Sequence, residues 1–253
     1  MKLATWNVNS LKVRLPQVLE FLAAHKPDAL CLQETKSEDA NFPLAEIKAA
    51  GYQAAYSGQK TYNGVAILTP TAPLEVSVGI PSFDDPQKRV IAETVNGVRV
   101  ICVYIPNGEA VDSDKYKYKL GWLTQLIVWL KQEMAKYPKL ALLGDYNIAP
   151  EDRDVYDPKF WTGKVLFSEP EKAAFKDMLA LGLTDGFRMF EQPEKSYSWW
   201  DYRMNGFKRN LGMRIDHILL SAELAKGCKR CAIDRDFRAK ERPSDHAPVI
   251  VEI

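Results

Sequence analysis

The chain has almost no net charge, few cysteines and no long apolar run, and each absence narrows the class of protein. Its 253 residues include 34 Lys and Arg against 33 Asp and Glu, which gives a formal net charge of +1. Global charge therefore predicts no polyanionic partner. Four cysteines in this length do not make the disulfide framework of a small secreted domain. No apolar stretch approaches the roughly 20 residues that a membrane span needs.

The start of the chain also lacks the pattern of a secretory signal, because residues 1–7 already read as a strand. The sequence contains no Ser/Gly tract, no low-complexity block and no repeat that would mark a linker. We therefore expect a soluble, cytoplasmic protein without a membrane partner, in which residues 1–253 form one domain.

Apolar periodicity predicts helices and strands that are mixed along the whole chain. Residues 2–6 and 29–32 read as strands on either side of a helix over 15–22, with Pro16 near the helix start. A longer helix is expected over residues 118–135, and a capping box at 168–171 predicts another. Further strands are expected at residues 52–56, 64–68, 76–78, 90–103, 140–143, 214–220 and 248–253.

One dipeptide excludes a purely parallel sheet. Asn96-Gly97 splits the apolar run 90–103, and this pair favours a tight hairpin turn between antiparallel strands. Periodicity alone therefore supports an α/β fold with mixed sheets. A sandwich of two sheets between helical layers fits the pattern.

Short polar stretches stand at the ends of several strand-like runs. They are residues 6–9, 33–34, 104, 144–147, 214–216 and 244–246. Brought to one edge, they would cluster four carboxylates, an imidazole, a phenol and side-chain amides. Clustered carboxylates repel one another unless some are protonated or a cation lies among them. The set therefore predicts a divalent metal site of the kind that cleaves phosphoesters.

The individual residues carry different weight. Glu34 is sufficient as the dominant ligand of a hard cation, which prefers few carboxylates and keeps its waters. Asp145 and Asn147 are two apart, so in extended chain they share a face and could hold a water and a phosphate oxygen. A local turn remains the alternative for this pair and for Asn7. Tyr104 ends an apolar run, which is also common without catalysis.

The histidine at position 246 needs an acid to fix its tautomer and hold its positive charge. Its neighbour Asp245 is a poor candidate, because adjacent side chains in extended chain point to opposite faces. Asp216, at the start of its own strand, is the better candidate. His217 follows inside that strand and is expected to be structural.

Local charge is more informative than net charge. Basic residues alternate with aromatic ones at residues 199–209 and again at 115–119. Cations that meet phosphates and rings that meet bases or sugars are typical of a nucleic-acid surface. A solvated loop with half-buried rings is the alternative.

Taken together, these stretches resemble the exonuclease III family of AP endonucleases, within the endonuclease/exonuclease/phosphatase superfamily. The resemblance spans essentially the whole chain. Its carriers are residues 5–10, 32–36, 62–66, 144–150, 199–203, 212–216 and 244–248. It implies a four-layer sandwich of two mixed β-sheets flanked by helices, the deoxyribonuclease-I-like fold.

The resemblance also implies an activity. Proteins of this family are Mg²⁺-dependent phosphodiesterases, with Mn²⁺ as a substitute, that act as monomers in base excision repair. They cleave duplex DNA 5′ to abasic sites, and many show 3′-5′ exonuclease or 3′-phosphatase activity. The expected partner is therefore double-stranded DNA with an abasic site or a 3′ end.

Roles carry over by motif. The resemblance implies that Asp145 activates the attacking water, and that Asp216 partners His246. Three residues, Asn147, His246 and Tyr104, are implied at the scissile phosphate. The implied metal set, with Asp245 beside a possible second ion, is Glu34, Asn7, Asp145, Asn147 and Asp245.

A second implied set forms the DNA-binding surface and a pocket for a flipped, base-less sugar. Its members are Trp199, Arg203, Met213, Arg214 and Ile215. Plain core packing is the alternative for Met213 and Ile215. A bulky Leu166 near the site could narrow access and shift the balance among the three activities.

Two other functions remain open. One is an inositol phosphate or sphingomyelin phosphodiesterase of the same fold, which would share the acidic and histidine residues. The basic-aromatic segment 199–209 argues against it. The other is a non-catalytic DNA-binding relative, against which the intact set of acid, amide and imidazole argues.

Overall fold

Six strands form a first sheet, sheet A, in which parallel and antiparallel pairs are mixed. The computed structural model describes residues 1–81 and 83–253. β1 pairs with β2 in parallel, and the other neighbours in the sheet are antiparallel. In spatial order the strands are β13 (Arg230–Ile233), β14 (Val249–Glu252), β1 (Lys2–Asn7), β2 (Ala29–Gln33), β4 (Val65–Thr69) and β3 (Gln53–Ser57).

A second sheet, sheet B, is also mixed, with β7 and β8 as its parallel pair. Asn96 (φ 50°) and Gly97 (φ 78°) form the tight turn between β6 and β7, as the sequence predicts. In spatial order the strands are β5 (Ser77–Val78), β6 (Val90–Val95), β7 (Val98–Tyr104), β8 (Leu140–Asp145), β12 (Asp216–Ser221) and β9 (Leu183–Asp185).

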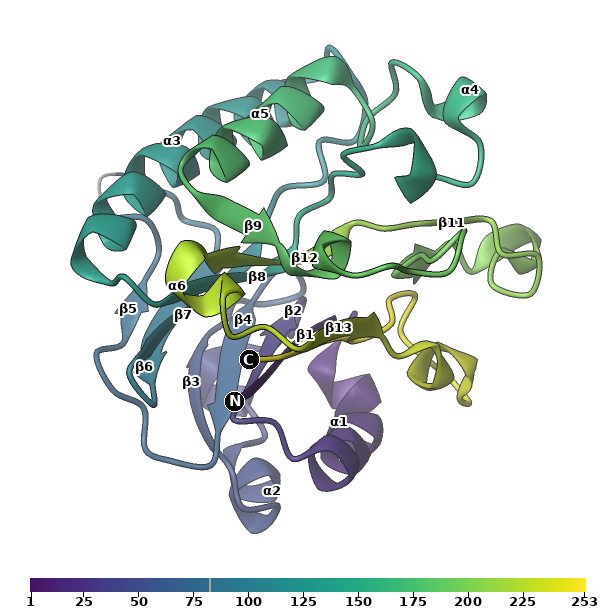
Figure 1. Ribbon diagram of the computed structural model, residues 1–253. Helices are drawn as coiled ribbons and strands as arrows, with labels where there is room; N and C mark the ends of the chain where they lie inside the picture. Colours follow the sequence, from purple (N-terminus) through teal and green to yellow (C-terminus); the bar gives the residue numbers. More distant parts are fainter. Residues whose placement is uncertain (82) are drawn as a thin grey trace.

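Helices cover the outer faces of both sheets, and Figure 1 shows the resulting layers. α1 (Leu11–His25) and α2 (Leu44–Ala49) pack on sheet A. α3 (Asp114–Lys136) and α5 (Glu169–Ala180) pack side by side on sheet B. The predicted four-layer sandwich of two mixed sheets is therefore confirmed.

Shorter elements complete the described chain. A separate two-stranded ribbon pairs Trp199 with Met213. The remaining elements are β10 (Trp199–Trp200), β11 (Gly212–Met213), α4 (Pro158–Trp161), α6 (Ala222–Ala225) and the 3-10 turns η1 (Asp39–Asn41), η2 (Asp152–Asp154), η3 (Gly186–Met189), η4 (Arg203–Asn205) and η5 (Arg235–Ala239).

The main core lies between the two sheets and explains why several strands read as unbroken apolar runs. Cys31 from sheet A and Cys102, Val100 and Leu143 from sheet B belong to one buried cluster. The alternate residues of β8, Leu140 and Leu142, pack instead under α3 and α5. A strand buried on both faces needs apolar residues at every position, so alternation is lost.

Local signals place most elements but miss some boundaries. The capping box is confirmed, because the Ser168 backbone N–H donates to Glu171 Oε2 at 3.0 Å. Pro16 lies inside α1 and not near its start, since the helix already begins at Leu11. The expected strand over 214–220 begins only at Asp216. No helix among the described residues is long and apolar enough to cross a membrane.

Candidate active site

The polar ends of four strands meet at one edge of the sandwich. β1 ends at Asn7, β7 at Tyr104 and β8 at Asp145. β12 runs antiparallel to β8 and begins at this same edge, so Asp216 lies opposite Asp145 in register. Glu34 follows the last residue of β2 directly. The strand topology therefore brings together residues that are more than 200 positions apart.

Asn7 bridges two of the carboxylates. Its Nδ2 donates to Glu34 Oε1 and to Asp145 Oδ2, both at 2.8 Å. Its Oδ1 accepts from the Asn9 backbone N–H at 3.0 Å. In this orientation Asn7 holds the two acids together and offers its oxygen to the backbone.

One group of three residues has the geometry of a metal site. Glu34, Asp145 and His246 each offer an atom, and these atoms all lie within 4.8 Å of one another. The Lys36 ammonium lies 2.9 Å from Glu34 Oε2 and supplies positive charge at the same place. Carboxylate oxygens are the ligands that Mg²⁺ prefers, and Glu34 is partly open to solvent.

The state of Asp145 fits a nearby cation. Burial raises its pKa to about 7, with the carboxylates of Asp216 and Glu34 adding to the rise. His246 and the Asn7 hydrogen bond oppose the shift. A divalent cation beside the carboxylate would favour its ionised form. The residues present therefore suit a cation held chiefly by Glu34 and Asp145.

His246 is held by Asp216, as the sequence predicts. Its Nδ1 lies 2.9 Å from Asp216 Oδ2, and its Nε2 lies 3.7 Å from Asp145 Oδ2. Burial opposes a charged imidazole, but Asp216 and Asp145 outweigh it and raise the pKa of His246 to about 10. The ring is therefore an imidazolium at neutral pH. A charged ring is a donor on both nitrogens and a poor metal ligand.

Asn147 follows β8 in a left-handed conformation, with φ 50°. Its backbone N–H donates to Asp145 Oδ1 at 2.9 Å, and its Nδ2 donates to the Ile105 carbonyl at 3.0 Å. Asn107 Nδ2 donates to Asn147 Oδ1 at 3.1 Å. The amide is thus fixed beside Asp145 with its oxygen already engaged.

Tyr104 places a phenol next to the acids. Burial raises the pKa of Tyr104 well above its usual value, Glu34 and Asp145 raise it further, and Arg89 opposes the rise. The hydroxyl therefore keeps its proton at neutral pH. The Arg89 guanidinium lies 4.6 Å from the ring centre, and its Nη1 donates to the Tyr104 carbonyl at 3.0 Å.

Asp245 lies beside this group with both oxygens engaged. Oδ1 accepts from Asn9 Nδ2 and Oδ2 from Trp199 Nε1, each at 3.0 Å. Burial raises the pKa of Asp245, but His246 and these two donors outweigh it and lower the pKa overall. Asp245 therefore carries a negative charge and orients Trp199.

The predicted pocket residues do pack together. Leu166, Met213 and Ile215 are buried in one small cluster, with Trp199 partly exposed against it. Leu166 has φ 74°, a left-handed backbone that a leucine rarely adopts. The cluster lies next to His246, because Trp199 and His246 form a β-bridge.

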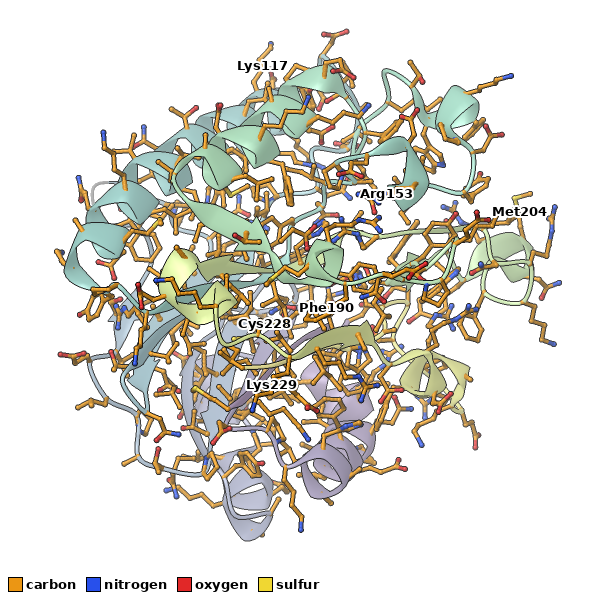
Figure 2. All side chains as sticks on the ribbon, viewed as in Figure 1. Lys117, Arg153, Phe190, Met204, Cys228 and Lys229 are labelled. Carbon is orange, nitrogen blue, oxygen red and sulfur yellow. The ribbon has the colours of Figure 1, made fainter. Side chains whose placement is uncertain are left out.

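The two arginines of the predicted DNA surface differ sharply. Arg203 is exposed on a loop, where it pairs with Asp201. The tip of this loop carries Met204, which projects into solvent (Figure 2). Arg214 is 1 % exposed and pairs with Asp154 and Asp185. Its guanidinium is buried between these two carboxylates, so we assign Arg214 a structural role.

Arg214 and His217 form one buried network. His217 Nδ1 lies 2.9 Å from Arg214 Nη1, and its Nε2 lies 2.8 Å from the Ile148 carbonyl. Burial and the charge of Arg214 lower the pKa of His217 to about 4. A neutral ring that accepts at Nδ1 and donates at Nε2 satisfies both contacts. This agrees with the structural role expected for His217.

The structure adds three residues that the sequence argument gave no role, and it buries a fourth, Lys119, which the basic-aromatic stretch 115–119 predicts to lie on a nucleic-acid surface. Lys36, Asn107, Arg89 and Lys119 all contact site residues. Lys36 and Asn107 stand within two or three positions of Glu34 and Tyr104, so proximity in sequence could have found them. Arg89 and Lys119 carry no local signal of this kind.

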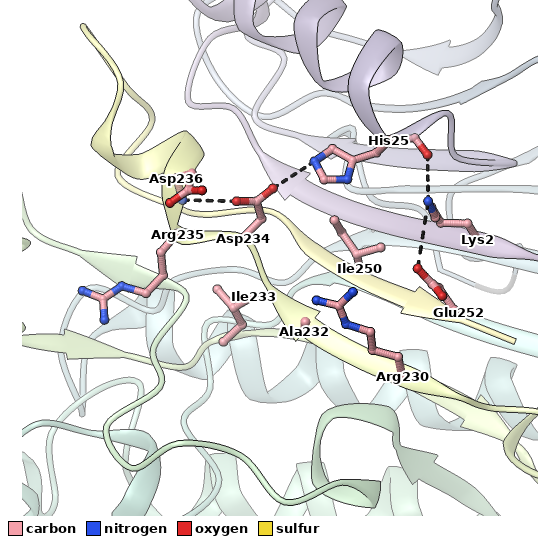
Figure 3. A pocket seen from close by; sticks show the side chains of 10 residues that line it. All are labelled: Lys2, His25, Arg230, Ala232, Ile233, Asp234, Arg235, Asp236, Ile250 and Glu252. Carbon is pink, nitrogen blue, oxygen red and sulfur yellow. Dashed lines mark hydrogen bonds and ion pairs between the residues drawn. The ribbon is translucent and has the colours of Figure 1, made fainter.

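A pocket lies on the outer face of sheet A, away from the group around Asp145. This pocket of about 370 Å³ is lined by residues of β1, β13 and β14 and by the end of α1 (Figure 3). Asp234 pairs with His25 at 2.9 Å, and Lys2 lies 4.0 Å from Glu252. It shares no residue with the group around Asp145, so the phosphoester chemistry predicted above lies elsewhere.

Comparison with known proteins agrees with this geometry. A model of the Endonuclease/Exonuclease/phosphatase family matches residues 4–246. Exodeoxyribonuclease III of Haemophilus influenzae is 38% identical over 265 residues, which cover 100% of this chain and 99% of that protein.

Two solved structures superpose along the full chain. A Neisseria 3′ phosphatase, NExo, solved with a product DNA hairpin, is 52% identical with a TM-score of 0.98, covering 100% of this chain and 99% of its own. An AP endonuclease from Archaeoglobus fulgidus is 39% identical with a TM-score of 0.96 and the same coverage. The chain therefore belongs to the exodeoxyribonuclease III group of the endonuclease/exonuclease/phosphatase family.

Proposed function

We propose that this protein is a metal-dependent DNA-repair phosphodiesterase of the exodeoxyribonuclease III type. Its reaction is hydrolysis of duplex DNA 5′ to abasic sites and at 3′ ends or 3′ phosphates. The observation that carries the proposal is the convergence of Glu34, Asp145 and His246 within 4.8 Å, with Asn147 fixed beside them. An acid that can take a proton thus lies next to donors that can stabilise a phosphate.

Asp145 is the proposed general base for the attacking water. Its carboxylate is anchored by the Asn7 amide and the Asn147 backbone N–H, so its orientation is fixed before substrate arrives. A pKa raised toward 7 makes it a better proton acceptor than an ordinary aspartate.

His246 and Asn147 are the proposed hydrogen-bond donors to the scissile phosphate. The imidazolium charge, maintained by Asp216, suits oxygens that gain negative charge in the transition state. Tyr104 supplies a neutral hydroxyl at the same edge. A cation held by Glu34, proposed as Mg²⁺ with Mn²⁺ as substitute, would add Lewis-acid stabilisation of phosphate charge.

The surroundings favour DNA as the substrate. A groove of about 770 Å³ opens beside Tyr104 and is also lined by Tyr62, Arg89 and Lys115. Cations and exposed rings along a groove suit a nucleic-acid backbone and its sugars. Leu166, Met213, Ile215 and Trp199 form what we call the Trp199–Leu166 cluster. We also propose that this cluster receives a base-less sugar, whose extrusion from the duplex costs least at a damaged site.

The proposal includes three properties of the whole protein. Residues 1–253 act as one domain, supported by the contribution of residues 7 to 246 to one site. The protein is expected to be a cytoplasmic monomer. Gel filtration checks the oligomeric state, cell fractionation checks the location, and a single cooperative unfolding transition would support one domain.

Three labelled duplexes test the activity. One holds an internal abasic site, one a 3′ phosphate at a nick, and one an undamaged recessed 3′ end. We expect cleavage with Mg²⁺ and none with EDTA or in Glu34→Ala. If the protein with Mg²⁺ or Mn²⁺ leaves all three duplexes intact but cleaves inositol phosphates or sphingomyelin, the result favours the inositol phosphate or sphingomyelin phosphodiesterase. Binding without any hydrolysis would favour the non-catalytic DNA-binding relative.

A further inference from the structure

A fully buried lysine contacts the two loops that carry Asn107 and Asn147. Lys119 belongs to α3, yet its side chain is 0 % exposed and its ammonium points toward these loops. Nζ donates to the Asn147 carbonyl at 2.6 Å and to the Asn107 carbonyl at 3.1 Å. One charge therefore joins the two loops whose side-chain amides also bond each other.

The partner of this lysine extends the connection to a third segment. Glu171, at the start of α5, lies 2.5 Å from Lys119 Nζ. Its Oε1 also accepts from the Leu166 backbone N–H at 3.0 Å, and its Oε2 accepts from the Ser168 backbone N–H at 3.0 Å. A single ion pair thus holds the Asn107, Asn147 and Leu166 segments together.

Two of these segments need such support. Leu166 (φ 74°) occupies the left-handed region, which a bulky residue adopts only if its surroundings enforce it. Asn147 (φ 50°) lies there too, at lower cost because asparagine adopts this region more readily, but its position beside Asp145 must still be fixed. The bonds from Lys119 and Glu171 reach the backbones of these two residues. Displacement of a positioned group by about 1 Å can cost roughly a hundredfold in rate.

We propose that Lys119, together with Glu171, is a positioning residue for catalysis and for substrate choice. It fixes Asn147 relative to Asp145 through the Asn147 carbonyl, and through Glu171 it fixes the Leu166 backbone, and so the place of Leu166 in its cluster with Met213, Ile215 and Trp199. The inference rests on the proposed function. It assigns to a buried ion pair the balance between abasic-site cleavage and removal of 3′ groups.

A general loss of stability would also lower activity, so a matched pair is needed. Arg99 and Glu133 form another buried ion pair, with Nε and Oε2 3.0 Å apart and side chains 4 % and 6 % exposed. Glu133 lies on α3, as Lys119 does, but near the other end of the helix. Arg99 lies at the opposite end of β7 from Tyr104. Breaking this pair removes comparable interactions without reaching the catalytic loops.

The experiment compares Lys119→Met, Lys119→Arg and Glu171→Gln with Arg99→Met. Steady-state rates are measured on the abasic and 3′-phosphate duplexes. Circular dichroism measures the folded fraction of each variant, and the rates are expressed per folded molecule. For Lys119→Met we expect kcat to fall about 10- to 100-fold with KM within about threefold, and the ratio of the two activities to change. Lys119→Arg should recover most of kcat, because it keeps a buried donor. Arg99→Met should keep the parent kcat and ratio.

The outcomes separate the two proposals. A parent without activity on either duplex refutes the proposed function itself. An active parent whose folded Lys119→Met variant keeps the same kcat and ratio overturns the positioning role. An equal loss in Arg99→Met overturns it too, since the effect would then follow stability alone. If Lys119→Met does not fold, Glu171→Gln decides by the same criteria.

Discussion

His246 Nδ1 lies 2.9 Å from Asp216 Oδ2, although the two residues are 30 positions apart and His246 has an aspartate as its immediate neighbour. That neighbour, Asp245, points instead to Trp199 and Asn9. Against the effect of burial, Asp216 and Asp145 together raise the pKa of His246 to about 10. The positive charge of His246 therefore depends on its carboxylate neighbours, of which Asp216 is the one in direct hydrogen-bond contact.

This contact predicts the behaviour of a double-mutant cycle. His246→Ala should lower kcat/KM on abasic duplex, because a charged hydrogen-bond donor to the transition state is lost. The expected loss of transition-state stabilisation is about 3 kcal/mol. Asp216→Asn alone should also be damaging, but should add little in the His246→Ala background. Steady-state kinetics on all four proteins measures the coupling.

The cycle has a clear contrary result. Fully additive losses would mean that Asp216 acts independently of His246. The base opposite the abasic site serves as a control, because phosphate stabilisation should depend little on it. A strong dependence of the His246→Ala defect on that base would indicate positioning of DNA.

Asp145→Asn separates binding from turnover. The variant keeps the shape and the hydrogen-bond acceptor for the Asn147 backbone N–H, but it cannot take a proton from water. We expect DNA affinity within about threefold of the parent and a loss of kcat of at least about a hundredfold. Fluorescence anisotropy and single-turnover cleavage measure the two quantities. Parent-like single-turnover rates would remove Asp145 from the role of base.

The sequence predicts well which polar residues meet at one edge of the sandwich, because the signals there are local. Asp145 and Asn147 follow a buried apolar strand directly, and the parity of an extended chain already separates Asp245 from His246. With Asp245 set aside by that parity, Asp216 at the start of its own strand is the remaining candidate partner for His246. The sequence predicts mixed sheets but no strand order, and the order that brings these ends together comes from the structure.

Interior charges are the part that the sequence does not reveal. Arg214 stands in a basic-aromatic stretch and reads as a DNA contact, yet its partners Asp154 and Asp185 lie far away in the chain. Lys119 likewise stands in the basic-aromatic stretch 115–119, which predicts a nucleic-acid surface, but it is fully buried against Glu171. Burial of a charge depends on partners from other elements, and a local pattern contains no information about them.

Leu166 offers a test of substrate access with its own internal control. A left-handed φ costs a residue with a Cβ about 1 kcal/mol, and glycine escapes this cost. Leu166→Gly should therefore be about 1 kcal/mol more stable than Leu166→Ala, which loses a similar amount of side chain. Urea unfolding of both variants measures the difference.

The same two variants test specificity. Removing the leucine side chain opens space beside Met213, Ile215 and Trp199, with which Leu166 packs. We expect the rate of abasic cleavage to rise relative to 3′-phosphate removal in both Leu166→Gly and Leu166→Ala. An unchanged ratio in both variants would show that Leu166 does not control access.

Glu93 predicts a pH dependence of stability that is independent of the catalytic site. The residue is 0 % exposed, and neither carboxyl oxygen accepts a hydrogen bond from the residues that the structure describes. Burial raises its pKa from 4.5 to about 7, against the opposing effects of Thr69 and Arg99. The native state therefore keeps a proton that the unfolded chain releases at lower pH.

The sign follows from proton linkage. As pH rises from about 4.5 to about 7, the unfolded state binds fewer protons than the native state, so this group's contribution to stability is lost across that window. The full pKa difference corresponds to about 3 kcal/mol. Glu93→Gln cannot ionise, so it should gain on the parent by up to about this amount between pH 4.5 and pH 8. Urea unfolding at both pH values gives the difference, with exposed Glu46→Gln as the control for loss of one charge. A mutant–parent difference that stays constant with pH would mean that Glu93 is ionised in the folded protein.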